Sequence, residues 1–240
     1  MKIKKGLRLI RILFLLIFQL IKNYPMLNQN LEHNFIICKR ICQKILRAAG
    51  VHLAASGNEN LPDTPFLLVS NHRCFFDVVI LLAVVDKPIR FVAAKELYRY
   101  PFLRKYLASI QCVPIERYTR DFSKIKGSIG EISRALEKSN LVLFPEGECS
   151  YGKKKMSSFK RGGFMGVTGK DIWIVPCFLH INSFEHVGRW MIPDGEVRVV
   201  MGKAFRPEEA ENENVSGAPS GALAVYARKQ VRRLQEEVEN

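Results

Sequence analysis

The feature that most restricts the possible folds of this chain is an alternation of short apolar segments and helical patterns after residue 60. Six apolar segments have the length and composition of buried strands: residues 66–70, 89–94, 112–115, 141–144, 172–179 and 197–201. Helical patterns lie between them, at residues 77–85, 101–110, 121–136 and 161–168. This alternation predicts an α/β fold with a mixed, largely parallel sheet that helices cover on both faces.

A histidine and a carboxylate follow the first apolar segment, in the sequence NHRCFFD at residues 71–77. Open α/β sheets place their chemistry at the carboxyl ends of strands. A histidine there can accept a proton near neutral pH, and a carboxylate can orient it and stabilise the imidazolium. Positions five apart lie about 140° apart on one helix. His72 and Asp77 therefore meet only if His72 lies in the turn and Asp77 in the first helical turn. The spacing alone also suits a surface histidine beside a carboxylate at a helix N-terminus.

Further short motifs overlap or follow the later apolar segments, and we refer to each of them as a block. They are VPIER at 113–117, PEGECS at 145–150, FKRGG at 159–163 and IVPC at 174–177. Together with the histidine block, and with His72 and Glu146 separated by 74 positions, this set resembles the glycerolipid acyltransferase family typified by 1-acylglycerol-3-phosphate acyltransferase. The resemblance covers roughly residues 60 to 205.

The resemblance implies transfer of a fatty acyl group from a thioester to a lipid hydroxyl. No cofactor is expected, and the donor substrate would be acyl-CoA or an acyl-carrier protein. His72 would be the general base and Asp77 its orienting partner. Because the acceptor oxygen itself attacks, no acyl-enzyme is needed.

The same resemblance suggests which residues bind a lysophospholipid acceptor. They are Arg117, Glu146, Gly147 and Lys160. After the glycine that matches Gly147, the family usually has Thr and then Arg, whereas Glu148 and Cys149 stand at these positions here. A carboxylate beside a phosphate is repulsive unless it turns away or pairs with a cation. Acyl transfer is still the expected reaction, but these two residues leave the identity of the acceptor lipid open.

The charge of the chain is unevenly distributed. The net charge is +14, and residues 1–50 contribute +9 of it, with ten Lys or Arg against Glu32 alone. A nucleic-acid binder more often spreads its basic residues over the folded domain. Here they accompany apolar residues, which indicates an anionic membrane surface as the partner and argues against nucleic acid.

Two helical patterns in the first 50 residues are separated by Tyr24-Pro25. Residues 9–21 are apolar but number only 13, whereas a membrane span needs about 20. With the second pattern, in residues 31–49, they predict an amphipathic two-helix motif lying in the membrane interface. Two alternatives stay open. The first pattern could belong to a signal peptide, although no small-residue cleavage site follows it before Pro25. The second could be a core helix of the domain.

These patterns divide the chain into four parts. Residues 1–50 form a membrane-interface hairpin, 51–206 an acyltransferase catalytic domain, 207–220 a linker and 221–240 a C-terminal helix. Membrane association on the cytoplasmic face, through residues 1–50, is the expected localisation.

The six cysteines show no paired zinc-ligand spacing, so no metal site is expected and packing thiols are the favoured interpretation. Cys74, Cys149 and Cys177 fall in motif blocks and Cys112 directly precedes one, which leaves a thiol nucleophile as the less favoured interpretation. Three functions remain open: a lysophosphatidate acyltransferase, an acyltransferase for another lysolipid such as an aminolipid or glycolipid, and a catalytically silent membrane-binding scaffold.

Overall fold

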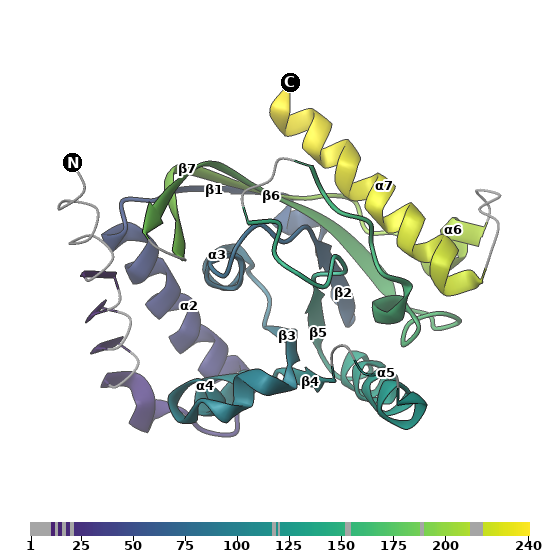
Figure 1. The fold of residues 1–240 in the computed structure, drawn as a ribbon, viewed down its shortest axis with the longest axis horizontal. Coiled ribbons are helices and arrows are strands. Elements are labelled where there is room, and N and C mark those ends of the chain that lie inside the picture. Colours follow the sequence, from purple (N-terminus) through teal and green to yellow (C-terminus); the bar gives the residue numbers. More distant parts are fainter. Residues whose placement is uncertain are drawn as a thin grey trace.

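The computed structural model describes residues 22–116, 119, 121–151, 155–187, 190–211 and 218–240, together with residues 11, 12, 14, 15, 18 and 19. The strands of this part form one seven-stranded sheet in the order β1-β7-β6-β2-β5-β3-β4 (Figure 1). Their bounds are β1 His52–Ser56, β2 Phe66–Ser70, β3 Ile89–Ala94, β4 Val113–Ile115, β5 Asn140–Leu143, β6 Trp173–Val187 and β7 Trp190–Met201. Only the β6–β7 pair within the described sheet is antiparallel.

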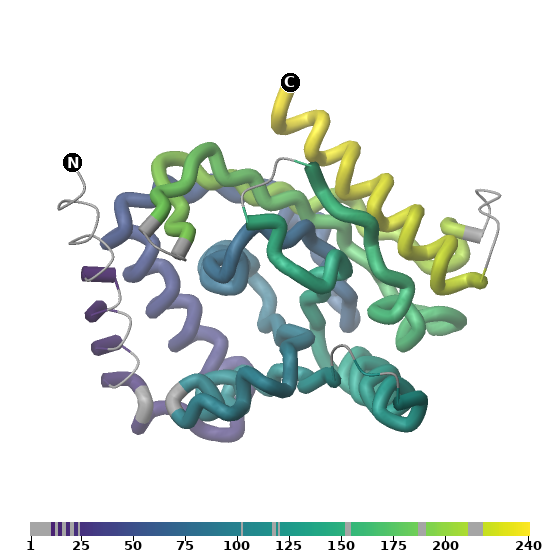
Figure 2. Tube along the Cα trace, in the orientation of Figure 1, coloured from purple at the N-terminus to yellow at the C-terminus, as the bar shows by residue number. Residues whose placement is uncertain are grey.

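Helices cover both faces of the sheet. One face carries α2 (Leu31–Ala48), α3 (Asp77–Val84) and α4 (Pro101–Ser109), and the other carries α5 (Phe122–Leu136) and α7 (Pro219–Glu239). Figure 2 shows α2 and α7 on opposite sides of the sheet. Strand β2 joins the two cores, because Phe66 and Leu68 belong to the first and Leu67 and Val69 to the second. The predicted α/β class with a largely parallel, doubly covered sheet is confirmed.

Shorter elements complete the fold: η1 Tyr24–Met26, η2 Asn58–Asn60, η3 Lys95–Arg99, η4 Arg161–Phe164 and α6 Pro207–Glu211. The helix expected over 161–168 is only the 3-10 turn η4. Two adjacent glycines weaken a helix there. In addition, a Cβ on Gly163 would lie 2.7 Å from Leu143 Cδ2, so the turn sits tightly against β5. Helix α6 lies within the segment expected to be a linker.

Strand β1 is the one described strand that the apolar pattern did not predict. Its residues are mostly exposed and include two alanines and a serine, which have weak strand propensity. Strand β1 forms at the sheet edge because β7 offers it a parallel partner, from His52 opposite Glu196 to Ser56 opposite Val200.

Helix α2 packs into the core beside α3. Its apolar stripe is buried, with Phe35, Ile41 and Ile45 at 5 % exposure or less. On its polar side, Lys39 Nζ donates to Asp86 Oδ1 at 2.7 Å, just beyond the end of α3. Of the two interpretations of this segment, the structure therefore favours the core helix. The division of the chain at residue 50 stays a prediction.

Most of residues 9–21 lie outside the described part of the chain. Phe14 and Phe18, which are described, are both exposed and stack with ring centroids 6.3 Å apart. Within the described residues, no helix has the length and apolar character needed to cross a bilayer.

Candidate active site

The loop between β2 and α3 brings His72 and Asp77 into contact. Strand β2 ends at Ser70, and Asp77 is the first residue of α3. His72 lies in the intervening turn, and its Nδ1 is 2.7 Å from Asp77 Oδ2. With His72 in the turn and Asp77 in the first turn of α3, the two side chains meet although they are five positions apart. Because an ionised carboxylate can only accept, His72 Nδ1 carries the donated hydrogen and Nε2 faces the site.

Asp77 is fully buried and holds the turn as well as the imidazole. Its Oδ2 also accepts hydrogen bonds from the backbone amides of Arg73 at 2.5 Å and Cys74 at 3.0 Å. A buried carboxylate needs such donors, since an unpaired charge in the interior is costly. The turn that follows β2 is thus folded around the carboxylate that orients the histidine.

The loop after β5 forms hydrogen bonds with both backbone polar groups of His72. The amide of His72 donates to Glu146 Oε1 at 2.8 Å, and the carbonyl of His72 accepts from the amide of Ser150 at 2.7 Å. The second oxygen of Glu146 accepts from the amide of Ser157 at 2.8 Å. Glu146 is 2 % exposed, so its carboxylate supports the scaffold of the site. Its predicted role in acceptor binding stays a prediction.

Gly147 lets this loop turn beside a lysine. Its φ is +75°, in the left-handed region that favours glycine. A Cβ on Gly147 would lie 2.8 Å from Lys160 Nζ. Two of the residues expected to bind the acceptor, Gly147 and Lys160, are therefore neighbours at the rim of the site, where Lys160 is exposed. Arg117 lies outside the described residues. Glu148 is exposed, so its carboxylate can turn away from a bound phosphate.

The second ring nitrogen of His72 is in contact with a thiol. Cys149 Sγ lies 3.1 Å from His72 Nε2. The ring of Phe144 stacks on the imidazole, with centroids 4.1 Å apart and planes 16° from parallel. We refer to His72, Asp77, Glu146 and Cys149 as the His72 cluster.

The electrostatics of this cluster favour a charged imidazole. Burial of His72 disfavours the cation, but hydrogen bonds and charges at Asp77 and Cys149 outweigh burial and raise the His72 pKa from 6.5 to about 9. The His72 cluster therefore stabilises the imidazolium relative to the neutral ring.

The contacts of Cys149 and Phe144 with His72 were not predicted from the sequence. Cys149 was named as a departure from the family pattern, but packing was the favoured interpretation of its thiol, although its place three residues after Glu146 was a usable signal. Phe144 was taken only as the end of a strand. Nothing in a single sequence places its ring against a histidine 72 positions earlier.

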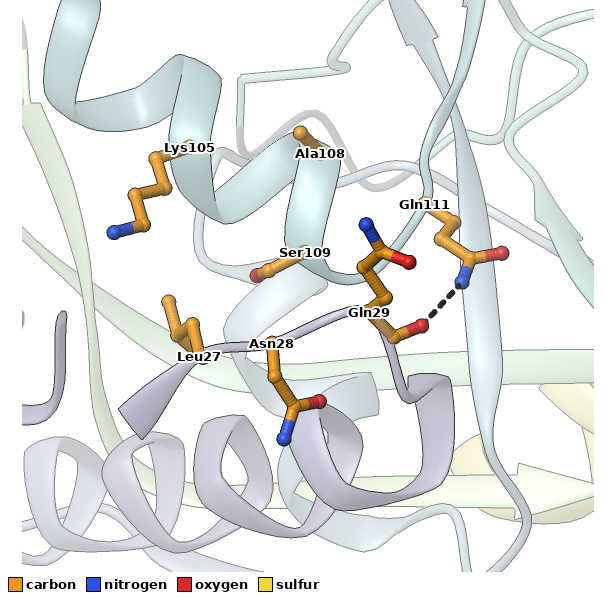
Figure 3. A pocket seen from close by; sticks show the side chains of 7 residues that line it. All are labelled: Leu27, Asn28, Gln29, Lys105, Ala108, Ser109 and Gln111. Carbon is orange, nitrogen blue, oxygen red and sulfur yellow. Dashed lines mark hydrogen bonds between the residues drawn. The ribbon is translucent and has the colours of Figure 1, made fainter. Parts of the chain in front are cut away.

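A separate hollow of about 480 Å³ lies between α4 and the loop that precedes α2 (Figure 3). It is lined by Leu27, Asn28, Gln29, Lys105, Ala108, Ser109 and Gln111. The Gln111 side chain donates to the Gln29 carbonyl across it at 3.4 Å. None of these residues belongs to the His72 cluster. Among the described residues, no group of three or more His, Cys, Asp or Glu is placed to hold a metal ion.

Comparison with known proteins relates the whole cluster to one family. A family model described as Acyltransferase matches residues 52–180, which include every member of the His72 cluster. The 1-acyl-sn-glycerol-3-phosphate acyltransferase of Saccharomyces cerevisiae is 31% identical over 56% of this chain and 45% of its own length. That of Pseudomonas aeruginosa is 24% identical over 77% of this chain and 72% of its own.

The chloroplastic enzyme of that name from Arabidopsis thaliana is 27% identical over 65% of this chain, which spans only 44% of the plant protein. Among solved structures, the 1-acyl-sn-glycerophosphate acyltransferase PlsC from Thermotoga maritima superposes with a TM-score of 0.77 at 21% identity. That match covers 100% of this chain and 98% of PlsC, and at this identity it supports the fold. The family match extends over more than half of the chain and contains its histidine–aspartate pair, so the chain belongs to the acyltransferase family.

Proposed function

We propose that this protein transfers a fatty acyl group from an acyl thioester to the free hydroxyl of 1-acylglycerol-3-phosphate, giving phosphatidic acid for phospholipid synthesis. The donor is acyl-CoA or an acyl-carrier protein. The observation that carries the proposal is the His72–Asp77 pair at the carboxyl end of β2, 2.7 Å apart within the matched family domain. Relatives whose names specify this reaction support the choice of acceptor.

The chemistry required is removal of a proton from a weakly nucleophilic hydroxyl as it attacks the thioester. A positioned base typically contributes ~10²–10⁴-fold to such a step. His72 Nε2 is the atom that would accept this proton, and Asp77 would stabilise the imidazolium that forms. The thiol of the donor then leaves and takes the proton from His72. An intact, well-bonded pair of this kind also argues against a catalytically silent scaffold.

Acceptor binding is assigned to cations at the rim of the site. Lys160, beside Gly147, is a described cation near the loop after β5, and Arg117 is the family position that would hold the phosphate. A guanidinium beside a phosphate makes a bidentate, charge-assisted pair.

Membrane association is proposed to depend on the N-terminal residues that precede α2. Residues 1–22 hold six Lys or Arg and no acid, and Phe14 and Phe18 expose their rings. Each cation near an anionic surface contributes about 1 kcal/mol. Binding of the full chain to anionic vesicles should therefore weaken with salt, and binding that is indifferent to salt would contradict the electrostatic part of this idea. The cytoplasmic face is the proposed side.

The test is acyl transfer by the purified chain, with labelled acyl donor and a panel of lysolipids. Wild-type protein should convert 1-acylglycerol-3-phosphate in preference to the other acceptors, and His72→Ala should abolish transfer. His52→Ala, an exposed histidine on β1, is the matched control and should keep wild-type activity. Transfer by His72→Ala within a few-fold of wild type would refute the assigned chemistry.

A second acceptor class is favoured by one observation, the carboxylate of Glu148 in the loop after β5. Glu148→Thr should leave transfer to a phosphate acceptor unchanged or improve it, because the substitution removes a negative charge. Loss of activity on this substitution, with wild-type preference for an amine-bearing lysolipid, would instead assign Glu148 to a cationic headgroup.

A further inference from the structure

One thiol in this protein differs from the rest. All six cysteines lie in the described part of the chain, and five of them are buried. Burial raises the pKa of Cys112 and Cys177 to about 12, so these thiols stay protonated and unreactive. Cys149 is partly exposed and lies in the loop after β5, as a member of the His72 cluster.

Cys149 completes a nucleophile–base–carboxylate arrangement. Its Sγ is 3.1 Å from His72 Nε2, while His72 Nδ1 is 2.7 Å from Asp77 Oδ2. A nucleophile in contact with a base that a third group orients is the signature of covalent catalysis. The contact is fixed by the backbone as well, because the neighbouring amide of Ser150 donates to the His72 carbonyl.

The same contact is an obstacle to direct transfer. Nε2 is the atom that would accept the proton of the lysolipid hydroxyl, and the thiol already occupies its hydrogen-bonding direction. The hydrogen bonds of His72 to Asp77 and Cys149 also raise the His72 pKa to about 9, which favours the imidazolium. A protonated histidine is instead a suitable partner for a thiolate, the reactive form of cysteine.

We propose that Cys149 is a further catalytic residue, which accepts the acyl group from the donor thioester and passes it to the lysolipid hydroxyl. The proposal rests on the proposed acyltransferase function. It replaces the expectation that no acyl-enzyme forms in this protein.

The steps balance without an added reactant. The Cys149 thiol gives its proton to His72 as its sulfur attacks the donor carbonyl, a new carbon–sulfur bond forms, and the bond to the donor sulfur breaks. The imidazolium of His72 gives its proton to the departing thiolate, so the free donor thiol leaves. One thioester replaces another, and no energy source is required. The lysolipid hydroxyl then attacks the acyl-Cys149 carbonyl, its proton passes to His72, and the departing Cys149 sulfur takes this proton to restore the starting thiol.

Acylation also converts His72 into the base that the second step needs. The proton of the imidazolium departs with the donor thiol, and the acylated Cys149 has no proton to share with His72 Nε2. His72 is then neutral, still bonded to Asp77, and its Nε2 is available to the acceptor hydroxyl.

The experiment uses the full chain in anionic vesicles with labelled palmitoyl-CoA or palmitoyl carrier protein, and no acceptor. Wild-type protein should acquire about one label per chain, released by neutral hydroxylamine as expected of a thioester and mapped to the peptide containing Cys149. The label should form at least as fast as turnover and should move to 1-acylglycerol-3-phosphate when that lipid is added. Wild-type protein should also exchange labelled CoA into palmitoyl-CoA without acceptor, as a two-step mechanism requires.

The variants separate this proposal from the function on which it rests. Cys149→Ala should lose the label and at least ~100-fold in transfer, whereas Cys112→Ala, a buried thiol outside the His72 cluster, is the matched control. Transfer by Cys149→Ala within threefold of wild type would overturn the proposal and leave the acyltransferase function intact. If Cys149→Ala is poorly folded, the wild-type measurement decides, because wild-type transfer without label or exchange also overturns the proposal. Label on Cys149 without transfer to any lysolipid would support the acyl-enzyme and refute the proposed function.

Discussion

Replacement of Asp77 by Asn is the sharpest test of how the site acts on its histidine. Asn has nearly the same shape as Asp, and its side-chain oxygen can still accept from the backbone amides of Arg73 and Cys74. The substitution therefore removes the charge that faces His72 Nδ1 while it keeps the turn. We expect the variant to fold and to lose most of its activity.

The magnitude follows from the His72 pKa. A rise from 6.5 to about 9 corresponds to about 3 kcal/mol in favour of the imidazolium, at 1.36 kcal/mol per tenfold change. Asp77 and Cys149 produce this rise against the effect of burial, so the contribution of Asp77 is a large share of it. A loss of ~10²-fold in kcat is the expected minimum. The ~10⁴-fold loss on the same substitution in serine hydrolases is an upper reference.

The assay is steady-state acyl transfer with purified protein, alongside circular dichroism to establish folding. Asp86→Asn is the control, because Asp86 is 65% exposed and its pair with Lys39 lies on the surface. Surface pairs contribute ~0–1 kcal/mol to stability, and Asp86 lies beyond the end of α3 that is opposite Asp77. A folded Asp77→Asn variant with kcat within tenfold of wild type would refute the reasoning.

Three further predictions concern the scaffold. Glu146→Gln should lower the free energy of unfolding by about 1–3 kcal/mol in denaturant titration. The reason is that an NH₂ group would face one of the two backbone amides that now donate to the carboxylate. Unchanged stability would contradict the scaffold role. Gly147→Ala should cost about 1–2 kcal/mol from its positive φ and raise the acceptor KM by displacing Lys160, whereas Gly130→Ala, with open space around its Cβ, should be neutral or stabilising. The raised pKa of His72 stabilises the fold fully below pH 6.5, and this contribution should be lost as the pH rises to about 9; a His72→Ala variant should lack that part of the pH dependence in thermal unfolding.

The sequence predicted the His72–Asp77 contact because the contact is local. An apolar strand, a short turn and a helix that begins at Asp77 allow one arrangement in which both side chains meet. The strands β2 and β3 were predicted with their observed bounds for a similar reason, since both are mainly apolar, with every residue of β2 and alternate residues of β3 buried. Strand β1 and the core position of α2 depend on distant partners, namely β7 and α3, and local patterns carry little information about them.

The contact of Cys149 with His72 could not be predicted from the sequence. The pairing of Val69 with Leu143 in parallel strands brings the ends of β2 and β5 together, and a largely parallel sheet made that neighbourhood plausible. The path of the loop after β5 then decides which side chain meets the imidazole. That path depends on the positive φ of Gly147 and on the two amides bound by Glu146, which are properties of the folded loop.

The two departures from the family pattern, Glu148 and Cys149, are adjacent in sequence but act in different places. Glu148 is exposed at the rim, where it can alter only the approach of a charged headgroup. Cys149 contacts the base itself, where it alters proton transfer. If these effects are separate, the double variant Glu148→Thr, Cys149→Ala should show changes in acceptor preference and in kcat that add as free energies. A coupling energy above about 0.5 kcal/mol would mean that headgroup charge and thiol chemistry share one step, and the acceptor would then have to bind before the acyl group reaches Cys149.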